Sequence, residues 1–124
     1  MQQEKRTFRR IAVEHSIRII EADGSILPAI AVDVSLTGMQ ILCDGPTMNR
    51  ISAYGTQTNA SHGVRIHVRL SVPDAAENQG RIGLFSRVVV VRQNGEDEFR
   101  LGVQFTDFEA GSYNALEAYI DSHV

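Results

Sequence analysis

Residues 64–72 read VRIHVRLSV, a segment in which apolar and polar side chains alternate without interruption. A period of two is typical of a β-strand that has one face in the core and the other in solvent. The polar positions of this segment hold two arginines, a histidine and a serine, which we expect to point outward. The side chains expected to point inward are Val64, Ile66, Val68, Leu70 and Val72.

The same reasoning predicts five further strands along the chain. They cover residues 13–20, 29–34, 39–43, 86–92 and 99–105. Turn-forming residues separate several of them, namely Ala22-Asp23-Gly24-Ser25 and the pair Asn94-Gly95, which favours a hairpin. Six strands in series with short connections predict a mainly β fold, an antiparallel barrel or sandwich.

The period changes near the end of the chain. Four apolar or aromatic residues there recur at helical spacing, and Ser112 precedes them as a candidate N-cap, so we expect a short amphipathic helix over residues 112–122. Residues 44–63 are polar and rich in Gly, Ser, Thr and Asn, and we expect them to form a long surface loop.

Composition restricts the class of protein. The chain has 124 residues, 43% of them hydrophobic and 22% charged, which suits one globular domain with its own core. No segment approaches the roughly 20 consecutive apolar residues of a membrane helix, and no apolar stretch follows the basic N-terminus, so we expect a cytoplasmic protein without membrane insertion. A single cysteine, Cys43, and four scattered histidines predict no disulfide, no metal site and no cofactor.

The charge balance argues against a protein that coats DNA or RNA. The formal net charge is −3, whereas such binding depends on neutralising many phosphates with Lys and Arg. Four cations nevertheless lie within six residues, at Lys5, Arg6, Arg9 and Arg10. A small anionic ligand therefore remains compatible with the sequence, because the arginine fork can bind phosphate through two hydrogen bonds.

Two motifs are candidates for a ligand site. The first is RxxxR at Arg6 and Arg10, which taken alone is more often a solvated basic tail than a site; the same spacing recurs at Arg65 and Arg69 inside a predicted strand. The second, DxSxxG over residues 33–38, is far rarer by chance. Asp and Ser turn the backbone through side-chain hydrogen bonds, and Gly38 permits a positive φ or a close approach by a ligand, so a turn without a ligand is the alternative.

The order of the two motifs resembles that of the PilZ domain family, whose members are receptors for the bacterial second messenger cyclic di-GMP. RxxxR precedes the first strand and DxSxxG follows the second, while FRLGVQF at 99–105 and the helix after it resemble the family's last strand and C-terminal helix. The resemblance implies a six-stranded antiparallel β-barrel with an N-terminal arm and a trailing helix. The divisions expected on this basis are an arm over 1–11, a barrel over 12–106 and a helical end over 107–124.

The resemblance also implies the residues of the site. In the family, the arginines at the positions of Arg6 and Arg10 hold phosphates and guanine edges, and residues at the positions of Asp33, Ser35 and Gly38 surround a guanine. Further candidate cations lie nearby in the sequence or on a late strand, and each is otherwise a solvated surface residue: Lys5, Arg9 and Arg92.

We therefore expect a receptor that binds cyclic di-GMP, as one molecule or an intercalated pair, and relays the signal to an unidentified protein partner. Neither a Ser/His/Asp nor a Cys/His set is evident in the sequence, so we do not expect an enzyme. The alternative is a PilZ-like adaptor of pilus, flagellar or polysaccharide machinery that binds no nucleotide. A small barrel that binds a flavin or single-stranded nucleic acid is disfavoured by the acidic net charge and the few aromatic residues.

Overall fold

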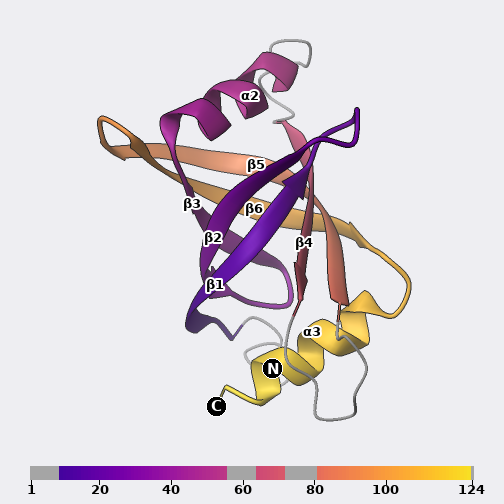
Figure 1. The fold of residues 1–124 in the computed structure, drawn as a ribbon. Coiled ribbons are helices and arrows are strands. Elements are labelled where there is room, and N and C mark those ends of the chain that lie inside the picture. Colours follow the sequence, from indigo (N-terminus) through magenta and orange to yellow (C-terminus); the bar gives the residue numbers. More distant parts are fainter. Residues whose placement is uncertain (1–8, 56–63, 72–80, 124) are drawn as a thin grey trace.

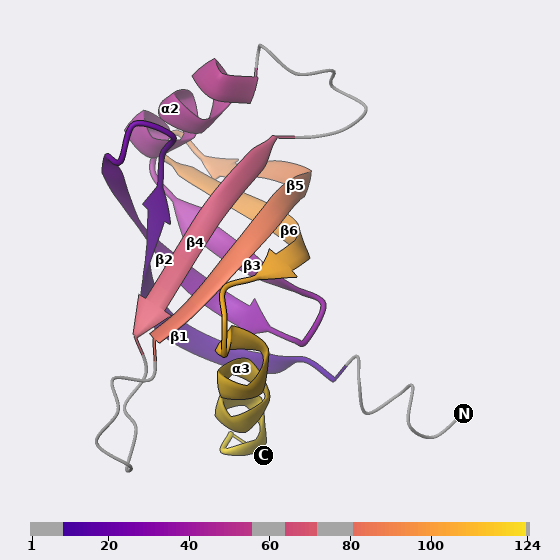
Figure 2. The same ribbon diagram turned by 90° about the vertical axis from the view of Figure 1, so that its right-hand side faces the viewer.

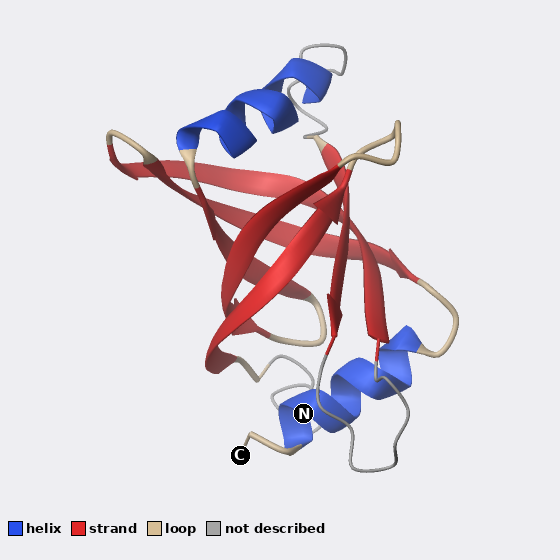
Figure 3. Ribbon diagram, in the orientation of Figure 1, coloured by secondary structure: helices blue, strands red, loops and turns tan. Residues whose placement is uncertain are grey.

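Six β-strands and two helices make up the computed structural model, which describes residues 9–55, 64–71 and 81–123 (Figures 1 and 3). The strands are β1 (Ile11–Ile20), β2 (Ile26–Val34), β3 (Gly38–Cys43), β4 (Arg65–Ser71), β5 (Arg81–Gly95) and β6 (Glu98–Phe108). The helices are α2 (Gly45–Gly55), which lies at one end of the strands, and α3 (Ser112–Asp121), which lies at the other.

The strands form a closed antiparallel ring in the order β1-β2-β3-β6-β5-β4. Four of the six pairings join strands that follow each other along the chain. The pairing of β3 with β6 and the pairing of β1 with β4 complete the ring. Figure 2 shows β4 and β5 side by side at the front of this ring, with α2 above them and α3 below. The predicted six-stranded antiparallel architecture with a C-terminal helix is confirmed.

Alternation along the strands directs one set of side chains into the ring, as the sequence predicts. On β4, Ile66, Val68 and Leu70 are buried while Arg65 and Ser71 are exposed. Val72, the last residue of the predicted pattern, lies outside the described residues. The largest fully buried apolar side chains come from every strand and from α3, and they are Ile19, Val34, Met39, Ile41, Val68, Ile82, Leu84, Leu101 and Leu116.

The β5–β6 hairpin is longer than the sequence predicts. Strand β5 begins at Arg81, five residues before the expected start, and its last residue, Gly95, pairs with Glu98. The two residues between them, Glu96 and Asp97, therefore form the turn, and Asn94-Gly95 belongs to the strand. The turn prediction was wrong by two residues, because pairing across the ladder continues through the sequence that favours a turn.

Helix α2 replaces the first half of the loop predicted over residues 44–63, and that prediction was wrong there; residues 56–63 lie outside the described part. Asp44 caps the helix, because its Oδ1 accepts a hydrogen bond of 2.9 Å from the backbone N–H of Thr47. The same hydrogen bond holds the pKa of Asp44 below its ordinary value. Pro46 follows in the first helical turn, a position that suits proline. Asp44 and Pro46 together were therefore a sequence signal for the start of a helix, although the residues around them favour loops.

Helix α2 is attached to the end of the ring by apolar and polar contacts. Met48 and Ile51, three residues apart, are buried in the core. Arg50 donates two hydrogen bonds to the buried carboxylate of Glu21, with Nη2 to Oε1 at 2.6 Å and Nε to Oε2 at 3.2 Å. The helix thus covers one end of the core and supplies the partner that a buried carboxylate requires.

Helix α3 occupies the predicted position, but Ser112 is not its cap. The N-cap is Gly111, whose φ of 80° lies in the left-handed region. Ser112 is buried, and its Oγ accepts a hydrogen bond of 2.8 Å from the backbone N–H of Gly83 on β5. Ser112 therefore ties the helix to the ring, and Leu116 and Ile120 bury their side chains beneath it. Among the described residues, no helix combines the length and apolar character needed to cross a membrane.

Candidate functional site

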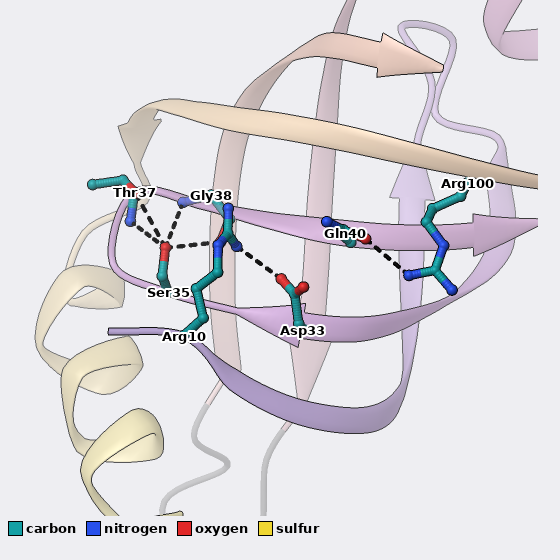
Figure 4. A network of polar contacts seen from close by, with 7 residues as sticks. All are labelled: Arg10, Asp33, Ser35, Thr37, Gly38, Gln40 and Arg100. Atoms are coloured by element: carbon teal, nitrogen blue, oxygen red, sulfur yellow. Dashed lines mark hydrogen bonds and ion pairs between the residues drawn. The ribbon is translucent and has the colours of Figure 1, made fainter. Parts of the chain in front are cut away.

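The connection between β2 and β3 is a turn organised by Ser35. Its Oγ accepts hydrogen bonds from the backbone N–H groups of Thr37 at 3.1 Å and Gly38 at 3.3 Å, and its own N–H donates to the carbonyl oxygen of Gly38 at 2.9 Å. The residue is 1% exposed, so the hydroxyl lies within the turn (Figure 4). The structure thus places Ser35 as the residue that fixes this turn.

Gly38 lies where β3 begins and meets β6. A Cβ atom at this position would lie 2.3 Å from the carbonyl oxygen of Val103, closer than any side-chain carbon can approach. The conformation of Gly38 is not left-handed, so the positive φ that the sequence allows is not used. What requires glycine here is the backbone of β6, a reason that the sequence did not suggest. The glycine allows β3 to pair with β6 directly after the turn.

Arg10 and Asp33 form an ion pair beside the turn. Arg10 immediately precedes β1, and Asp33 lies near the end of β2, where it is the register partner of Ala12. Arg10 Nη1 donates to Asp33 Oδ1 at 2.8 Å, and the two side chains are 49% and 24% exposed. An ion pair this accessible to water contributes only about 0–1 kcal/mol to stability, so either partner can exchange it for a ligand at little cost.

A pocket of about 230 Å³ opens beside this ion pair. Three arginines line it: Arg10, Arg92 near the end of β5, and Arg100 on β6. Its wall also includes Val89 and Val90 of β5, which are 52% and 46% exposed. Cationic groups next to exposed apolar surface suit an anion that also carries a flat, partly apolar group, as a nucleotide does.

Two of these arginines oppose each other across the β5–β6 ladder. Arg92 and Arg100 are register partners, and like charges directly opposite one another destabilise a sheet. Arg100 Nη1 donates to Oε1 of Gln40 on β3 at 2.9 Å, a neutral partner that leaves the positive charge uncompensated (Figure 4). Among the described residues, neither guanidinium forms an ion pair with a carboxylate. A bound anion would relieve the repulsion between them.

The structure brings together only some of the residues that the sequence suggests. Arg10, Asp33 and Arg92 lie at or beside the pocket, and Ser35 and Gly38 build the adjoining turn. The side chain of Arg9 lies elsewhere, because Nη2 pairs with Oδ1 of Asp121 on α3 at 3.1 Å. Lys5 and Arg6 lie outside the described residues.

Gln40 and Arg100 were not predicted. The alternating pattern of residues 99–105 shows that Arg100 faces outward, but many outward arginines have no function. The β2–β3 register places Gln40 opposite Asp33, and the pairing of β3 with β6, in which Leu42 is the register partner of Arg100, brings Arg100 to it. The β3–β6 pairing joins segments about sixty positions apart, so no local pattern indicates that Arg100 meets Gln40.

The other candidate groups have local structural partners. His15 and His123 both contact Tyr119, and His67 is hydrogen-bonded to Glu109. Within the described ranges, no three His, Cys, Asp or Glu residues gather as metal ligands do. Cys43 is buried, and burial raises the pKa of its thiol to about 11, so it behaves as a small apolar side chain.

Comparisons with known proteins identify the family and the fold. The sequence profile of the PilZ domain family matches residues 4–122. Solved structures of the same fold include the inhibitor of motility MotI/DgrA of Bacillus subtilis, with a TM-score of 0.66 and 14% identity over 95% of this chain and 50% of that one. The present chain therefore spans about half the length of MotI/DgrA.

Two further solved structures match over nearly their whole length. The PilZ domain of YcgR from Escherichia coli, solved with c-di-GMP, gives a TM-score of 0.62 and 18% identity over 96% of this chain and 91% of that one. The PilZ domain of CeSA from a cellulose-synthesizing bacterium gives a TM-score of 0.59 and 17% identity, covering 92% of this chain and 96% of that one. A comparison with curated protein sequences gave no match.

Proposed function

Because the chain belongs to the PilZ domain family, we propose that it is a receptor that binds cyclic di-GMP in the pocket beside Arg10 and Asp33. The observation that carries the proposal is the convergence of three arginines, Arg10, Arg92 and Arg100, on one pocket that also has an exposed apolar wall. The YcgR domain, which shares the fold, was solved with this nucleotide.

Arg10 and Asp33 suit the two kinds of group in the ligand. Cyclic di-GMP carries two phosphodiester charges and two guanines. A guanidinium binds phosphate oxygens or the O6 and N7 atoms of guanine through paired hydrogen bonds, and a carboxylate accepts hydrogen bonds from guanine N–H groups. In our proposal the ligand separates the Arg10–Asp33 pair and gives each residue a new partner, so the charge on neither side is left uncompensated.

Arg92 and Arg100 supply the second half of the site. Because they face each other across β5 and β6, one phosphate or one guanine edge lying between them would bind both and would reduce their repulsion. Gln40, which already holds Arg100, keeps that guanidinium at the pocket wall. We therefore add Gln40 and Arg100 to the ligand-binding residues that the sequence suggests.

Ser35 and Gly38 act on the ligand through the turn. The hydroxyl of Ser35 bonds to the backbone of the turn, and Gly38 lies against the carbonyl oxygen of Val103. Both residues fix the backbone that follows Asp33 and so hold the carboxylate at the edge of the pocket. In this assignment their substitution weakens binding by displacing Asp33.

The proposal extends to the segment before β1. Arg6 lies four residues before Arg10, within the family's motif, and we assign it to the same ligand as a further phosphate or guanine partner. Binding through two positions of this segment would couple the nucleotide to the start of the chain. We infer that this coupling changes the surface offered to a protein partner, through which the signal is relayed.

Isothermal titration calorimetry of the purified chain with cyclic di-GMP tests the proposal, with GTP as the control ligand. We expect saturable binding that weakens with salt, and loss of binding in an Arg6→Ala/Arg10→Ala double variant. Arg18→Ala is the matched control, because Arg18 is also an exposed arginine of the β1 region but does not line the pocket. Its affinity should equal that of the parent chain.

The alternative function is an adaptor that binds no nucleotide. One observation favours it: Arg10 and Asp33 satisfy each other without a ligand. If cyclic di-GMP at high concentration gives no heat of binding and no shift in the unfolding temperature, the receptor function is refuted and the adaptor function remains.

A further inference from the structure

A second basic surface lies on the outward face of β4 and its two neighbours in the ring, β1 and β5. Figure 2 shows β4 and β5 of this group at the front. Register places Arg18 of β1 opposite Arg69 of β4, and Arg65 of β4 opposite Arg87 of β5. Arg81 of β5 lies opposite Ser71 at the end of the same face. We call these five arginines, together with His67 and Phe85 between them, the β4 face.

The β4 face concentrates positive charge in a chain of net negative charge. It contains two directly opposed arginine pairs, Arg18 with Arg69 and Arg65 with Arg87, and each such pair costs stability. Between described residues, no ion pair includes Arg18 or Arg65. This surface includes the second RxxxR spacing of the sequence, Arg65 and Arg69, which the proposed nucleotide site does not use.

One carboxylate of the chain already binds to this face. Glu109, which lies between β6 and α3, accepts a hydrogen bond from Arg69 Nε at 2.8 Å and is hydrogen-bonded to His67. Its carboxylate lies directly over Gly83, where a Cβ atom would approach its Cδ to 2.1 Å. The face therefore has a geometry that accepts a carboxylate flat against the sheet, and Glu109 occupies only one such position.

An exposed aromatic ring lies between the two arginine pairs. Phe85 is 39% exposed and stacks on the imidazole of His67, with ring centroids 4.3 Å apart and planes 20° apart. His67 and Phe85 are register partners, so the ring is fixed by the sheet beneath it. Aromatic residues and arginine are the residue types that contribute most to the binding energy of protein interfaces, and the β4 face combines the two.

We propose that the β4 face docks an acidic segment of a partner protein, with carboxylates bound to Arg18 and Arg65 and an apolar side chain on Phe85. Glu109 and Asp107, the latter opposite Phe85 on β6, favour a protein over a nucleic acid. A continuous phosphate backbone would meet both carboxylates, whereas a peptide can place its acidic side chains between them. The ring order puts β4 across from β3, so this surface is separate from the pocket and its proposal does not depend on nucleotide binding.

Fluorescence anisotropy with two labelled peptides tests the proposal. One probe is a short run of glutamates, and the other has the same length with a central leucine. We expect both to bind the full chain at low salt, the leucine peptide more tightly, and an Arg18→Glu/Arg65→Glu variant to lose about tenfold or more in affinity. In Phe85→Ala the advantage of the leucine peptide should disappear.

The matched control is Arg92→Glu/Arg100→Glu, which reverses the opposed arginine pair of the pocket. We expect it to change peptide affinity less than about twofold, because it carries the same change in net charge at a different place. Urea unfolding checks that each variant is folded, and Arg18→Gln/Arg65→Gln replaces the charge reversal if that variant unfolds.

Three results would overturn the proposal. They are no peptide binding to the parent chain at millimolar peptide, equal losses in the two double variants, or a single-stranded oligonucleotide that displaces the peptide at much lower concentration. Titration of the same variants with cyclic di-GMP separates this proposal from the proposed function. The Arg92/Arg100 variant should lose the nucleotide and keep the peptide, and the Arg18/Arg65 variant should do the reverse.

Discussion

The ring carries two arginine–carboxylate pairs of equal length whose surroundings differ. Arg10 and Asp33 are joined at 2.8 Å beside the pocket, and Arg69 and Glu109 are joined at 2.8 Å on the opposite side. Among side chains of the described residues, the carboxylate of Asp33 has one partner, Arg10, which precedes β1. Glu109 has two, Arg69 and His67, and both belong to the interior of a strand.

The difference lies in what holds each carboxylate in place. The backbone N–H of Glu109 donates to the carbonyl oxygen of Gly83 at 3.0 Å, and its side chain covers that glycine. The hydrogen bond from Arg69 is the main reason that the pKa of Glu109 lies below its ordinary value. A carboxylate fixed at three points serves the attachment of α3, whereas one held by a single exposed arginine can serve a ligand. The comparison thus predicts opposite consequences for substitutions in the two pairs.

The largest expected effect comes from breaking the turn that presents Asp33. Gly38→Ala places a Cβ atom 2.3 Å from a backbone oxygen that the β3–β6 ladder prevents from moving. We expect a loss of about 3 kcal/mol in the free energy of unfolding, measured by urea denaturation. Gly102→Ala is the control, because there the Cβ atom would lie 3.4 Å from a side-chain carbon of Val90, an ordinary contact. Equal losses in the two variants would contradict the close-approach explanation.

The two ion pairs should separate ligand affinity from stability. Arg10→Ala removes an exposed partner, so we expect a change below about 1 kcal/mol in the free energy of unfolding but at least about tenfold weaker binding of cyclic di-GMP by calorimetry. Glu109→Gln should do the opposite, with a lower unfolding midpoint and unchanged nucleotide affinity. A loss of affinity in Glu109→Gln would show that the two sides of the ring are coupled.

The pH dependence of stability sharpens the comparison further. Because the folded-state pKa of Glu109 lies below the unfolded value near 4.5, its contribution is present above that value and is lost as the pH falls through the folded-state pKa. Asp23 and Asp44, whose pKa values are also lowered by hydrogen bonds, add losses of the same sign. The stability difference between the parent chain and Glu109→Gln should therefore be constant at neutral pH and shrink below about pH 4.5. Urea midpoints measured across this range that remain parallel would refute the role of the charge.

Local pattern predicted the six strands but left a barrel and a sandwich open, and the resemblance to the PilZ family implied the closed ring that the structure has. Over residues 65–71 and 99–105, the alternation assigns the more buried and the more exposed positions correctly, because a strand with one buried face must alternate. Arg10 and Asp33 were suggested as site residues by the order of two motifs that resembles the PilZ family, and their role in ligand binding stays a prediction. In the structure Arg10 and Asp33 meet because the β1–β2 register places the start of β1 beside the end of β2.

The remaining features depend on contacts between distant segments. Helix α2 was missed because its cap at Asp44 is followed by residues of low helical propensity, and burial of Met48 and Ile51 against the ring compensates for this. Ser112 was predicted to cap α3, but its hydroxyl oxygen instead accepts a hydrogen bond from the backbone N–H of Gly83 on β5. Gln40 and Arg100 meet only because β3 pairs with β6. A local pattern cannot indicate such pairings, because the alternation of buried and exposed residues within a strand is the same whichever strand lies beside it.

The smallest expected effects concern Arg9, which the sequence groups with the ligand-binding cations. Its guanidinium pairs with Asp121, and the two side chains are 35% and 66% exposed, so the pair should contribute no more than about 0.5 kcal/mol. We expect Arg9→Ala and Asp121→Ala to change the unfolding midpoint equally and slightly, and to change cyclic di-GMP affinity less than about twofold. If Arg9 instead binds the ligand, Arg9→Ala would weaken binding while Asp121→Ala would strengthen it, because releasing Arg9 from α3 would make it available. Calorimetry of the two variants at equal salt therefore decides whether the side chain of Arg9 binds the ligand alongside that of its neighbour Arg10.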